Sequence, residues 1–168
     1  AQEGAVDGWY QTKFTLKEEP LVSILIPNKD HTDDLDVCLN SFFERADYQN
    51  YEFIIIENNS VLPETFAYYE KIEKEHDNVK VVYWEAGFNY SAINNFGFKF
   101  AKGDYIMLLN NDVELITPDI FQSMLGFCMR PEVGIVGAKL LYNDHTVQHA
   151  GVLVGAGGLA DHVFKGIH

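Results

Sequence analysis

The sequence has 168 residues, of which 47% are hydrophobic and 14% aromatic, which is enough to bury the core of one domain. This composition excludes a disordered acidic tail, because such segments lack the apolar residues that drive folding. The formal net charge of −13 argues against a nucleic-acid-binding protein and against docking on anionic lipid, since both select basic surfaces. A chain this acidic needs a metal ion, backbone amides or a few local cations to bind phosphate groups.

The start of the chain and its cysteines indicate its setting. The chain begins at Ala1 without Met and has no run of about 18 apolar residues, so we expect a piece of a longer protein with no membrane-spanning segment. Cys38 and Cys128 fall at helical positions on apolar faces, and we expect no disulfide between them. The expected location is therefore reducing and cytoplasmic, which for the full-length protein includes the inner face of the cell membrane.

Strands and helices alternate along the first 130 residues. Residues 1–19 are mixed and polar, and we interpret them as a linker or an edge segment. Short β-rich apolar runs predict strands at residues 22–26, 53–56, 79–83 and 105–109. Apolar residues at helical spacing predict helices near residues 33–43, 63–75, 91–100 and 118–130. Residues 20–168 are therefore predicted to form an α/β, Rossmann-like domain with a mostly parallel sheet and helices on both faces.

Helix boundaries and core residues follow from the same patterns. Pro27 closes the first strand, Ser91 is the expected N-cap of the third helix, and Thr117 with Pro118 is the expected start of the fourth. After residue 131, strand-like runs at residues 134–141 and 147–154 flank a turn, and a glycine-rich tail follows. The side chains expected to point inward are Leu35, Cys38, Leu39, Phe42, Phe43, Phe66, Tyr69, Ile72, Ile93, Phe96, Phe100, Phe121, Met124, Leu125 and Cys128.

The strand predicted at residues 105–109 ends abruptly in amides and carboxylates. In an open α/β sheet, ligands bind beyond the carboxyl ends of the strands. Mg²⁺ and Mn²⁺ take oxygen ligands, usually one or two carboxylates together with substrate phosphates. Asp112 is therefore predicted to be a metal ligand, with Asn110 and Glu114 on the same side if the chain stays extended. The alternative is a polar strand end that enters a turn, because Asn and Asp are common turn formers.

Two other predicted strands also end in polar clusters, at residues 28–30 and 57–60. Parallel strands would gather all three clusters at one edge of the sheet. Amides and carboxylates suit the edges of a nucleotide base and the hydroxyls of a sugar, whereas a diphosphate there would need the metal. The helix that starts near Ser91 would offer backbone N–H groups to an anion. Lys29 is either a phosphate contact or a solvated loop lysine.

Taken together, four segments resemble family 2 glycosyltransferases of the GT-A fold, in particular bacterial members that build rhamnose-containing or other surface polysaccharides. The resemblance covers about residues 20–165, and its specificity comes from the order and spacing of the segments. They are PLVSILIPNKD at residues 20–30, IENNS at 56–60, FNYSAINNFG at 88–97 and LLNNDVE at 108–114. The segment QHAGV at residues 148–152 also looks like part of these enzymes.

The resemblance implies metal-dependent hexosyl transfer, with inversion, from a nucleotide-diphosphate sugar to a glycan or lipid-linked acceptor. By the same resemblance, Asp112 and Asn110 stand at the metal motif, where the family usually has Asp-x-Asp, and Glu57 stands where an Asp usually contacts the base. The resemblance assigns nucleotide-sugar binding to Pro27, Asn28, Asp30, Glu57, Asn59, Asn89, Asn94, Asn95, Asn111 and Asp112.

Two departures from the family pattern leave an alternative open. The first metal position is Asn110, so Asp112 is the remaining carboxylate of the motif. The general base of an inverting transfer is expected beyond residue 168, because neither Asp144 nor Asp161 lies in a matching motif. We therefore expect residues 20–168 to be the donor-binding part of an incomplete GT-A domain with little turnover. The alternative is a non-catalytic nucleotide-sugar-binding or scaffold module derived from this fold.

Three further interpretations are weaker. Residues 155–160 fit the G-x-G-x-x-A dinucleotide fingerprint in letters, yet that fingerprint requires a following helix. A nucleotidyltransferase should carry a glycine-rich loop after its first strand, and residues 28–31 contain no glycine. His145, His149 and His162 are either a late metal ligand or surface and structural histidines, and the absence of a fixed spacing favours the latter.

Overall fold

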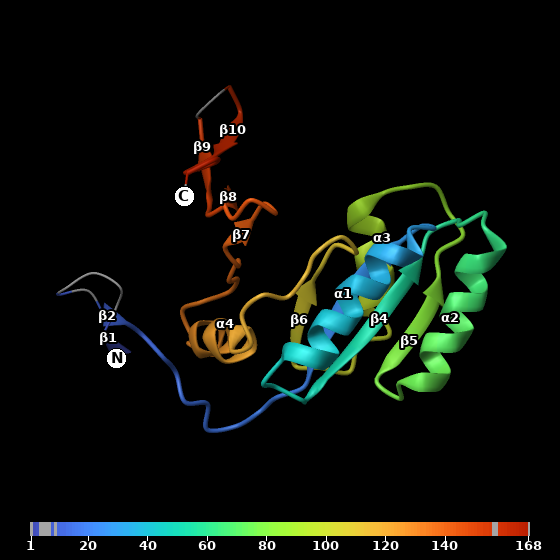
Figure 1. Ribbon diagram of the computed structural model, residues 1–168, viewed down its shortest axis with the longest axis horizontal. Helices are drawn as coiled ribbons and strands as arrows, with labels where there is room; N and C mark the ends of the chain where they lie inside the picture. The colour runs from blue at the N-terminus through green and yellow to red at the C-terminus, as the bar shows by residue number, and fades with distance from the viewer. Residues whose placement is uncertain (1, 4–7, 9, 156–157, 168) are drawn as a thin grey trace. The chain divides into compact units, whose positions relative to one another are not determined.

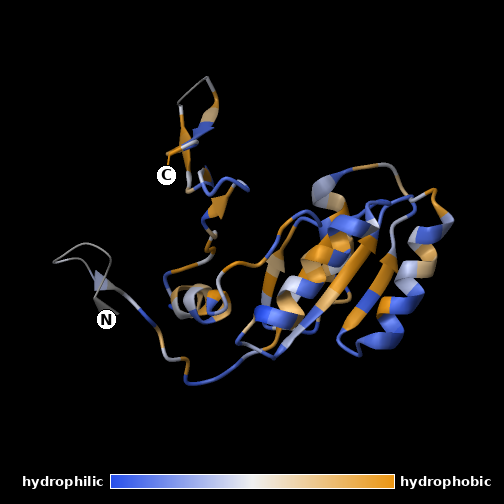
Figure 2. Ribbon diagram, in the orientation of Figure 1, coloured by the Kyte–Doolittle hydropathy of each residue, from blue (hydrophilic) through white to orange (hydrophobic). Residues whose placement is uncertain are grey.

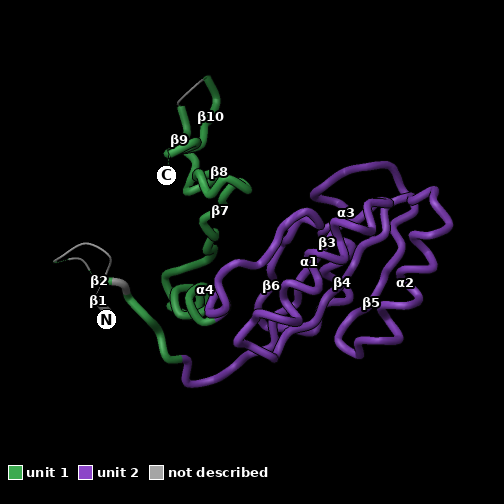
Figure 3. Tube along the Cα trace, in the orientation of Figure 1, with its two compact units in different colours: residues 1–15, 122–168 green, residues 16–121 purple. Residues whose placement is uncertain are grey.

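The computed structural model describes residues 2–3, 8, 10–155 and 158–167. Contacts divide the chain into two compact units, coloured differently in Figure 3. Leu16–Phe121 form one of them, which we call the sheet unit. Ala1–Thr15 and Gln122–His168 form the other, which we call the hairpin unit. Within the described ranges, no helix combines the length and the apolar character needed to cross a membrane.

The sheet unit is built on one parallel four-stranded sheet in the order β5-β4-β3-β6, with a helix between each pair of consecutive strands (Figure 1). This arrangement confirms the predicted α/β class with a parallel sheet. Its strands are β3 (Val22–Asn28), β4 (Tyr51–Glu57), β5 (Val79–Tyr83) and β6 (Tyr105–Leu108). Its helices are α1 (Thr32–Arg45), α2 (Pro63–Glu75) and α3 (Tyr90–Phe98).

Helices cover both faces of this sheet, as predicted. Successive side chains of a strand point to opposite faces. On one face, the rings of Phe42 and Phe43 on α1 each contact Phe53 of β4 with centroids 5.6 Å apart. On the other face, Ile93 of α3 joins a buried cluster with Leu25, Ile54, Ile56 and Val82. Figure 2 shows these strands as the most hydrophobic part of the unit.

The central strand β3 runs through Pro27 to Asn28, two residues beyond its predicted end. The backbone explains why proline is tolerated there. The carbonyl of Leu25 accepts a hydrogen bond from the Leu109 N–H on the β6 side, and Pro27, two residues later, faces the same side. The β3–β6 ladder has already ended at the pair Leu25 and Leu108, so the missing N–H of Pro27 removes no ladder bond.

Several predicted details of the helices are wrong. Phe66 is 36% exposed, although Tyr69 and Ile72 on the same helix are buried as predicted. The N-cap of α3 is Asn89 and not Ser91, because the Asn89 side chain accepts a hydrogen bond from the Ala92 N–H at 3.0 Å. Both residue types are good caps, and the chain enters the helix two residues earlier than predicted.

Strand β6 is less buried than its sequence predicted. Tyr105, Ile106 and Met107 are half-buried and Leu108 is 53% exposed. The reason is topological, since β6 lies at the edge of the sheet and has β3 as its neighbour on one side.

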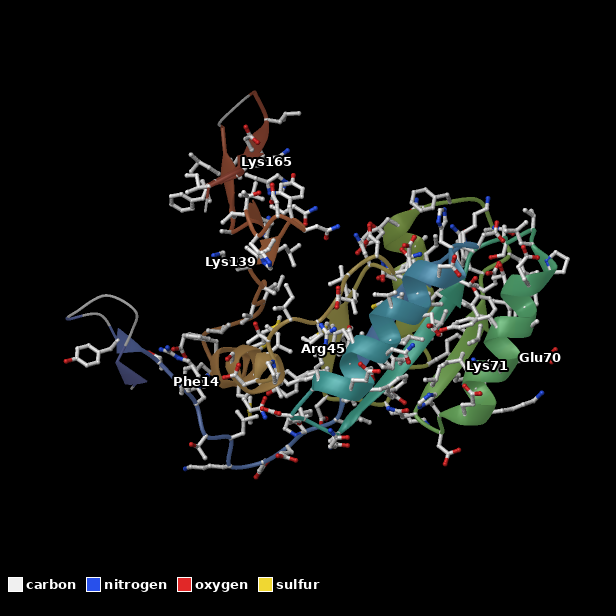
Figure 4. All side chains as sticks on the ribbon, viewed as in Figure 1. Phe14, Arg45, Glu70, Lys71, Lys139 and Lys165 are labelled. Carbon is white, nitrogen blue, oxygen red and sulfur yellow. The ribbon has the colours of Figure 1, made fainter. Side chains whose placement is uncertain are left out.

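The hairpin unit contains short antiparallel pairs. β1 (Gln2–Glu3) pairs with β2 (Tyr10–Gln11), β7 (Leu140–Leu141) with β8 (Val147–His149), and β9 (Val152–Val154) with β10 (Ala160–His162). Residues 134–139 form no strand, contrary to prediction. Within this unit the ring of Phe14, labelled in Figure 4, packs edge to face with the ring of Phe127, with centroids 4.7 Å apart.

Helix α4 (Ile120–Cys128) begins at the boundary between the units, two residues after the start that Thr117 and Pro118 predicted. Phe121 and Leu125 are buried as predicted, whereas Met124 and Cys128 are half-buried.

The dinucleotide fingerprint has no support in the fold. Ala156 and Gly157 lie outside the described residues, so their part of the predicted glycine-rich tail is not described. The segment that follows is β10, paired antiparallel with β9, where the fingerprint requires a helix.

A close backbone contact fixes the start of β6. The Gly103 N–H donates to Ser23 Oγ at 2.8 Å, and this hydroxyl donates to Glu52 Oε1 at 2.7 Å. A Cβ at Gly103 would lie 2.5 Å from the carbonyl oxygen of Leu21 and 2.7 Å from the Ser23 nitrogen. Both of these atoms belong to the backbone and cannot move aside like a side chain.

Gly103→Ala is therefore expected to lower the free energy of unfolding by about 3 kcal/mol, the upper range for overpacking. Chemical denaturation of both proteins measures this difference. Gly87→Ala is the matched control, because a Cβ there meets nothing within 4 Å, and its effect should stay within about 0.5 kcal/mol. Equal effects of the two substitutions would contradict the close contact at Gly103.

Candidate functional site

The carboxyl ends of β3, β4 and β6 meet at one edge of the sheet, as the strand-end pattern predicted. Asn28 is paired with Glu57 at the last position of the β3–β4 register. Beyond the strands, the Asn58 N–H donates to the Asn28 carbonyl at 2.8 Å, and the Asp30 N–H donates to Ser60 Oγ at 2.7 Å. The three polar clusters thus form one continuous polar edge.

The side chain of Asn28 joins all three strand ends. Its Nδ2 donates to the Asp30 carbonyl at 2.7 Å and to the hydroxyl of Tyr69 at 2.8 Å. Its Oδ1 accepts from Asn111 Nδ2 at 2.7 Å. Asn28 is 2% exposed, so these bonds form away from water. An amide with both nitrogen hydrogens and its oxygen engaged is held in one orientation.

Glu57 is buried beneath this edge and is 3% exposed. Its carboxylate accepts hydrogen bonds from the Ser60 N–H, the Ser60 hydroxyl and, at 2.9 Å, the hydroxyl of Tyr69. Among the residues that the structure describes, no salt bridge reaches it. Burying a carboxylate is costly unless donors compensate it, so these three donors explain how Glu57 is tolerated there.

The sequence did not reveal the role of Tyr69. Helical spacing places this residue among core side chains, and it is indeed fully buried. Burial is the main cause that raises the pKa of the Tyr69 hydroxyl, and the neighbouring Glu57 carboxylate raises it further. The hydroxyl therefore stays protonated and donates to Glu57. A tyrosine nearly two turns inside a helix, opposite a strand that ends in a carboxylate, is the signal that could have indicated this contact.

Asp30 caps helix α2 from another part of the chain. Its Oδ1 accepts from the Val61 and Leu62 N–H groups at 3.0 Å each and from the Thr65 hydroxyl at 3.2 Å. These bonds supply the cap that Leu62, at the N-cap position itself, does not provide. Partial burial raises the pKa of the Asp30 carboxyl, but the bonds from Leu62, Val61 and Thr65 outweigh it and lower the pKa below its usual value.

Both loops at this edge contain left-handed backbone. Asp30, His31 and Asn59 have φ angles of 53°, 43° and 59°. The left-handed region costs a non-glycine residue about 1–2 kcal/mol, although Asn and Asp tolerate it better than His. Asn59 is exposed, and its Nδ2 donates to the Ala86 carbonyl at 2.8 Å, which ties this loop to the segment before α3.

The three asparagines expected to close over a nucleotide occupy different environments. Asn89 caps α3, and Asn95 is exposed on the same helix. Asn94 is 5% exposed, and its Nδ2 donates to the Tyr90 carbonyl at 2.9 Å. Its Oδ1 is buried without a hydrogen-bond partner among the described residues. A buried acceptor of this kind is satisfied when a donor reaches it.

The segment after β6 follows helix α1 and does not stay extended. The Asn110 carbonyl lies 3.9 Å from Cys38 Sγ, and the Leu115 N–H donates to Ser41 Oγ at 2.9 Å. Arg45, labelled in Figure 4, donates to the Leu115 carbonyl and forms a 2.8 Å ion pair with Glu114. The turn at Asn111 and Asp112 therefore separates Glu114 from Asn110, contrary to the expectation for an extended chain.

Asp112 is the exposed carboxylate of this edge. Burial raises the pKa of the neighbouring Cys38 thiol to about 12, and the negative charge of Asp112 adds to this shift. Cys38 is therefore a neutral thiol beneath the turn and a poor nucleophile.

The side chains at this edge carry oxygen atoms of the kind that a hard cation binds. Among the described residues, no group of three or more His, Cys, Asp or Glu side chains could form a metal cage. Mg²⁺ and Mn²⁺ do not require one, because they bind through one or two carboxylates, amide or water oxygens and substrate phosphates. Asp112, with the amide oxygen of Asn110, offers such a partial oxygen donor set.

Comparison with known proteins decides the family. Residues 23–152 match the family described as Glycosyl transferase family 2. The chain belongs to this family. The family match spans the whole polar edge, from β3 to the residues that follow β6.

Two curated relatives of this family 2 domain are much longer than the chain. It is 41% identical over 155 residues to the O-antigen biosynthesis protein RfbC of Myxococcus xanthus, which covers 92% of this chain and 12% of that protein. It is 40% identical over 159 residues to the uncharacterized protein y4gI of Sinorhizobium fredii, which covers 95% of this chain and 18% of that protein. The chain thus spans less than a fifth of either relative.

Solved structures share the fold of this family 2 domain. The mannosyltransferase PcManGT of Pyrobaculum calidifontis, in complex with GDP-Man and Mn²⁺, superposes with a TM-score of 0.63 at 16% identity, over 70% of this chain and 35% of that one. Residues 1–349 of S. aureus TarS give a TM-score of 0.54 at 20% identity, over 64% of this chain and 32% of that one. These likenesses confirm the predicted GT-A fold.

The late histidines and acids of this family 2 domain lie in the hairpin unit. The Nδ1 atoms of His149 and His162 are 2.9 Å apart, and both rings line a shallow hollow with Lys165. His145 lies elsewhere, in the turn between β7 and β8, with a φ of 64°. Asp144 and Asp161 are exposed, and each accepts from a neighbouring backbone N–H.

The lowered pKa of Asp30 predicts how stability depends on pH. Because the folded-state pKa lies below the unfolded value of about 3.9, the stabilisation by Asp30 is complete above about pH 5 and is lost as the pH falls through the folded pKa. Asp30→Asn keeps the shape but not the charge, and should lower the free energy of unfolding at pH 7.

Urea denaturation between pH 7 and pH 3 measures this effect. The difference between wild type and Asp30→Asn should shrink as the pH falls. The control is Asp77→Asn, which replaces an exposed carboxylate beyond α2 that caps no helix start, and should give a smaller difference at pH 7. A difference for Asp30→Asn that is constant over this range would refute the capping role of its charge.

Proposed function

We propose that the polar edge of the sheet unit is the donor site of a glycosyltransferase that uses a nucleotide-diphosphate sugar and a divalent metal ion. The observation that carries the proposal is the convergence of three strand ends, at residues 28–30, 57–60 and 110–112, on one edge with exposed Asp112. Family 2 membership supports sugar transfer, and PcManGT, which shares the fold, is a mannosyltransferase solved in complex with GDP-Man and Mn²⁺.

In this proposal the segments at the polar edge have different tasks. The loops after β3 and β4 bind the nucleoside, with the second oxygen of Asp30 and the exposed amide of Asn59 as acceptors and donors. Asn89, Asn94 and Asn95 lie on the segment that closes over it. Asp112 and the amide oxygen of Asn110 would hold the metal ion, which when bound would supply positive charge beside the leaving diphosphate.

We further propose an inverting reaction on a glycan or lipid-linked acceptor within a longer protein. Inversion requires a carboxylate that removes the acceptor hydroxyl proton as the new glycosidic bond forms and the nucleoside diphosphate leaves. Neither Asp144 nor Asp161 is assigned this role, since each is exposed and accepts a hydrogen bond from a backbone N–H one or two residues further along the chain. The name of the Myxococcus xanthus relative supports a polysaccharide such as O-antigen as the product.

A second candidate is a non-catalytic module that binds a nucleotide-sugar or serves as a scaffold. Asn110 at the first metal position favours this candidate, because it leaves Asp112 as the remaining carboxylate of that motif. Metal-dependent nucleotide binding together with sugar transfer by a longer chain would exclude the scaffold role.

Calorimetric titration with UDP, dTDP and GDP, each with and without Mn²⁺, tests the donor site. One nucleotide should bind, and Mn²⁺ should tighten its binding. Asp112→Ala should remove this tightening. The affinity in the presence of Mn²⁺ should fall by more than the roughly tenfold that the loss of an outer-shell partner costs. Asp104→Ala, at the other end of β6, is the matched control and should bind as the wild type does. Failure of all three nucleotides to bind in the presence of Mn²⁺ would refute the donor-site proposal.

A further inference from the structure

The hydrogen bonds beneath the polar edge run in one direction. The Glu57 carboxylate has only acceptors, so the Tyr69 hydroxyl must donate its proton to it, at 2.9 Å. The Tyr69 oxygen can then only accept from Asn28, and it does so from Nδ2 at 2.8 Å. The nitrogen of the Asn28 amide, and not its oxygen, therefore faces Tyr69.

The same order continues to the loop that carries Asp112. With its Nδ2 turned to Tyr69, Asn28 presents Oδ1 to the β6 side, where it accepts from Asn111 Nδ2 at 2.7 Å. The orientation of the Asn111 amide is then fixed as well, with its nitrogen toward Asn28 and its side-chain oxygen directed away from Asn28. The buried Glu57 carboxylate thus acts, together with the Asp30 carbonyl that also accepts from Asn28 Nδ2 at 2.7 Å, on the orientation of the Asn111 amide, two hydrogen-bonded residues away.

We propose that Tyr69 is a positioning residue of the donor site, whose buried hydroxyl, ordered by Glu57, fixes the amides of Asn28 and Asn111 beside Asp112. The role of Tyr69 in binding rests on the proposed function. The direction of the hydrogen bonds does not depend on it. Tyr69 is fully buried and cannot touch a ligand, so it acts through Asn28 and Asn111. It also gives Glu57 a task other than direct contact with the base.

The arrangement connects the two sides of the site. Glu57 and Ser60 hold the loop after β4, Asn28 ends β3, and Asn111 precedes Asp112. If the Tyr69 hydroxyl is lost, one hydrogen of Asn28 Nδ2 loses its acceptor, and the bonds to the Asp30 carbonyl and to Asn111 alone restrain the amide. The acceptor that Asn28 presents to Asn111 is then less firmly held. Partners of this kind orient metal ligands, and their loss typically costs about tenfold or more in metal affinity.

The chain offers a matched control on the neighbouring residue. Tyr68 also lies on α2, is half-buried and donates its hydroxyl proton to a carboxylate, Asp36 Oδ1, at 3.1 Å. Tyr68→Phe therefore removes the same kind of bond as Tyr69→Phe, but Asp36 lies on α1 and not at the strand ends. Comparable falls in melting temperature are expected for the two variants.

The first experiment follows the side-chain amide signals of Asn28 and Asn111 in ¹H–¹⁵N spectra, without ligand. Tyr69→Phe should shift both pairs of signals, and Tyr68→Phe should leave them in place. An Asn111 signal that Tyr69→Phe does not move would overturn the proposal, whatever the chain binds. If Tyr69→Phe does not fold, Glu57→Gln replaces it, because a neutral amide of the same shape no longer imposes the direction of the bonds.

The second experiment titrates these variants with Mn²⁺ and whichever of UDP, dTDP or GDP binds the wild type. In the presence of Mn²⁺, Tyr69→Phe should bind the nucleotide about tenfold more weakly than the wild type does. Tyr68→Phe should bind it as the wild type does. Equal affinities in the two variants would overturn the positioning role even though the wild type binds. If the wild type itself does not bind, the donor-site proposal is refuted. The direction of the hydrogen bonds is tested separately, by the amide signals.

Discussion

The buried carboxylate of Glu57 is the constraint on which the polar edge depends. A charge with 3% exposure must be surrounded by donors, and the chain supplies them from a turn, through Ser60, and from a helix, through Tyr69. Satisfying Glu57 therefore fixes the path of the loop after β4 and the packing of α2 at the same time. The parallel register adds the third element, because it places Asn28 of β3 directly beside Glu57.

This constraint separates the groups that hold the site from those that face solvent. Glu57, Tyr69 and Asn28 are buried and bond to one another, whereas Asn59, Asn95 and Asp112 are exposed. Asp30 belongs to both sets, since one carboxylate oxygen caps α2 while the residue remains partly exposed. An edge arranged in this way resists deformation, because its exposed side chains lie beside buried ones whose positions are already determined.

Much of the fold could be predicted from the sequence, because hydrophobic periodicity reports burial. The bounds of α2 and β5 and the gathering of three polar strand ends follow from it directly. Periodicity does not report which neighbour a strand has, so the exposure of Leu108 on an edge strand was missed. Periodicity also treats Tyr69 as a core side chain like Ile72. It cannot show that the Tyr69 hydroxyl lies between Asn28 and Glu57. The cap at Asn89 in place of Ser91 reflects two suitable residues within one turn.

The position of Pro27 has a consequence for how this domain can change over time. The ladder between β3 and β6 ends at Leu25, before β3 itself ends, so the chain after Leu109 does not depend on strand pairing. Substitutions at residues 110–112 therefore leave the hydrogen bonds of the sheet intact. Replacement of Asn110 by Asp would add a charge to this turn with little penalty to folding. Natural variation can explore the chemistry of this turn while the scaffold beneath it stays constant.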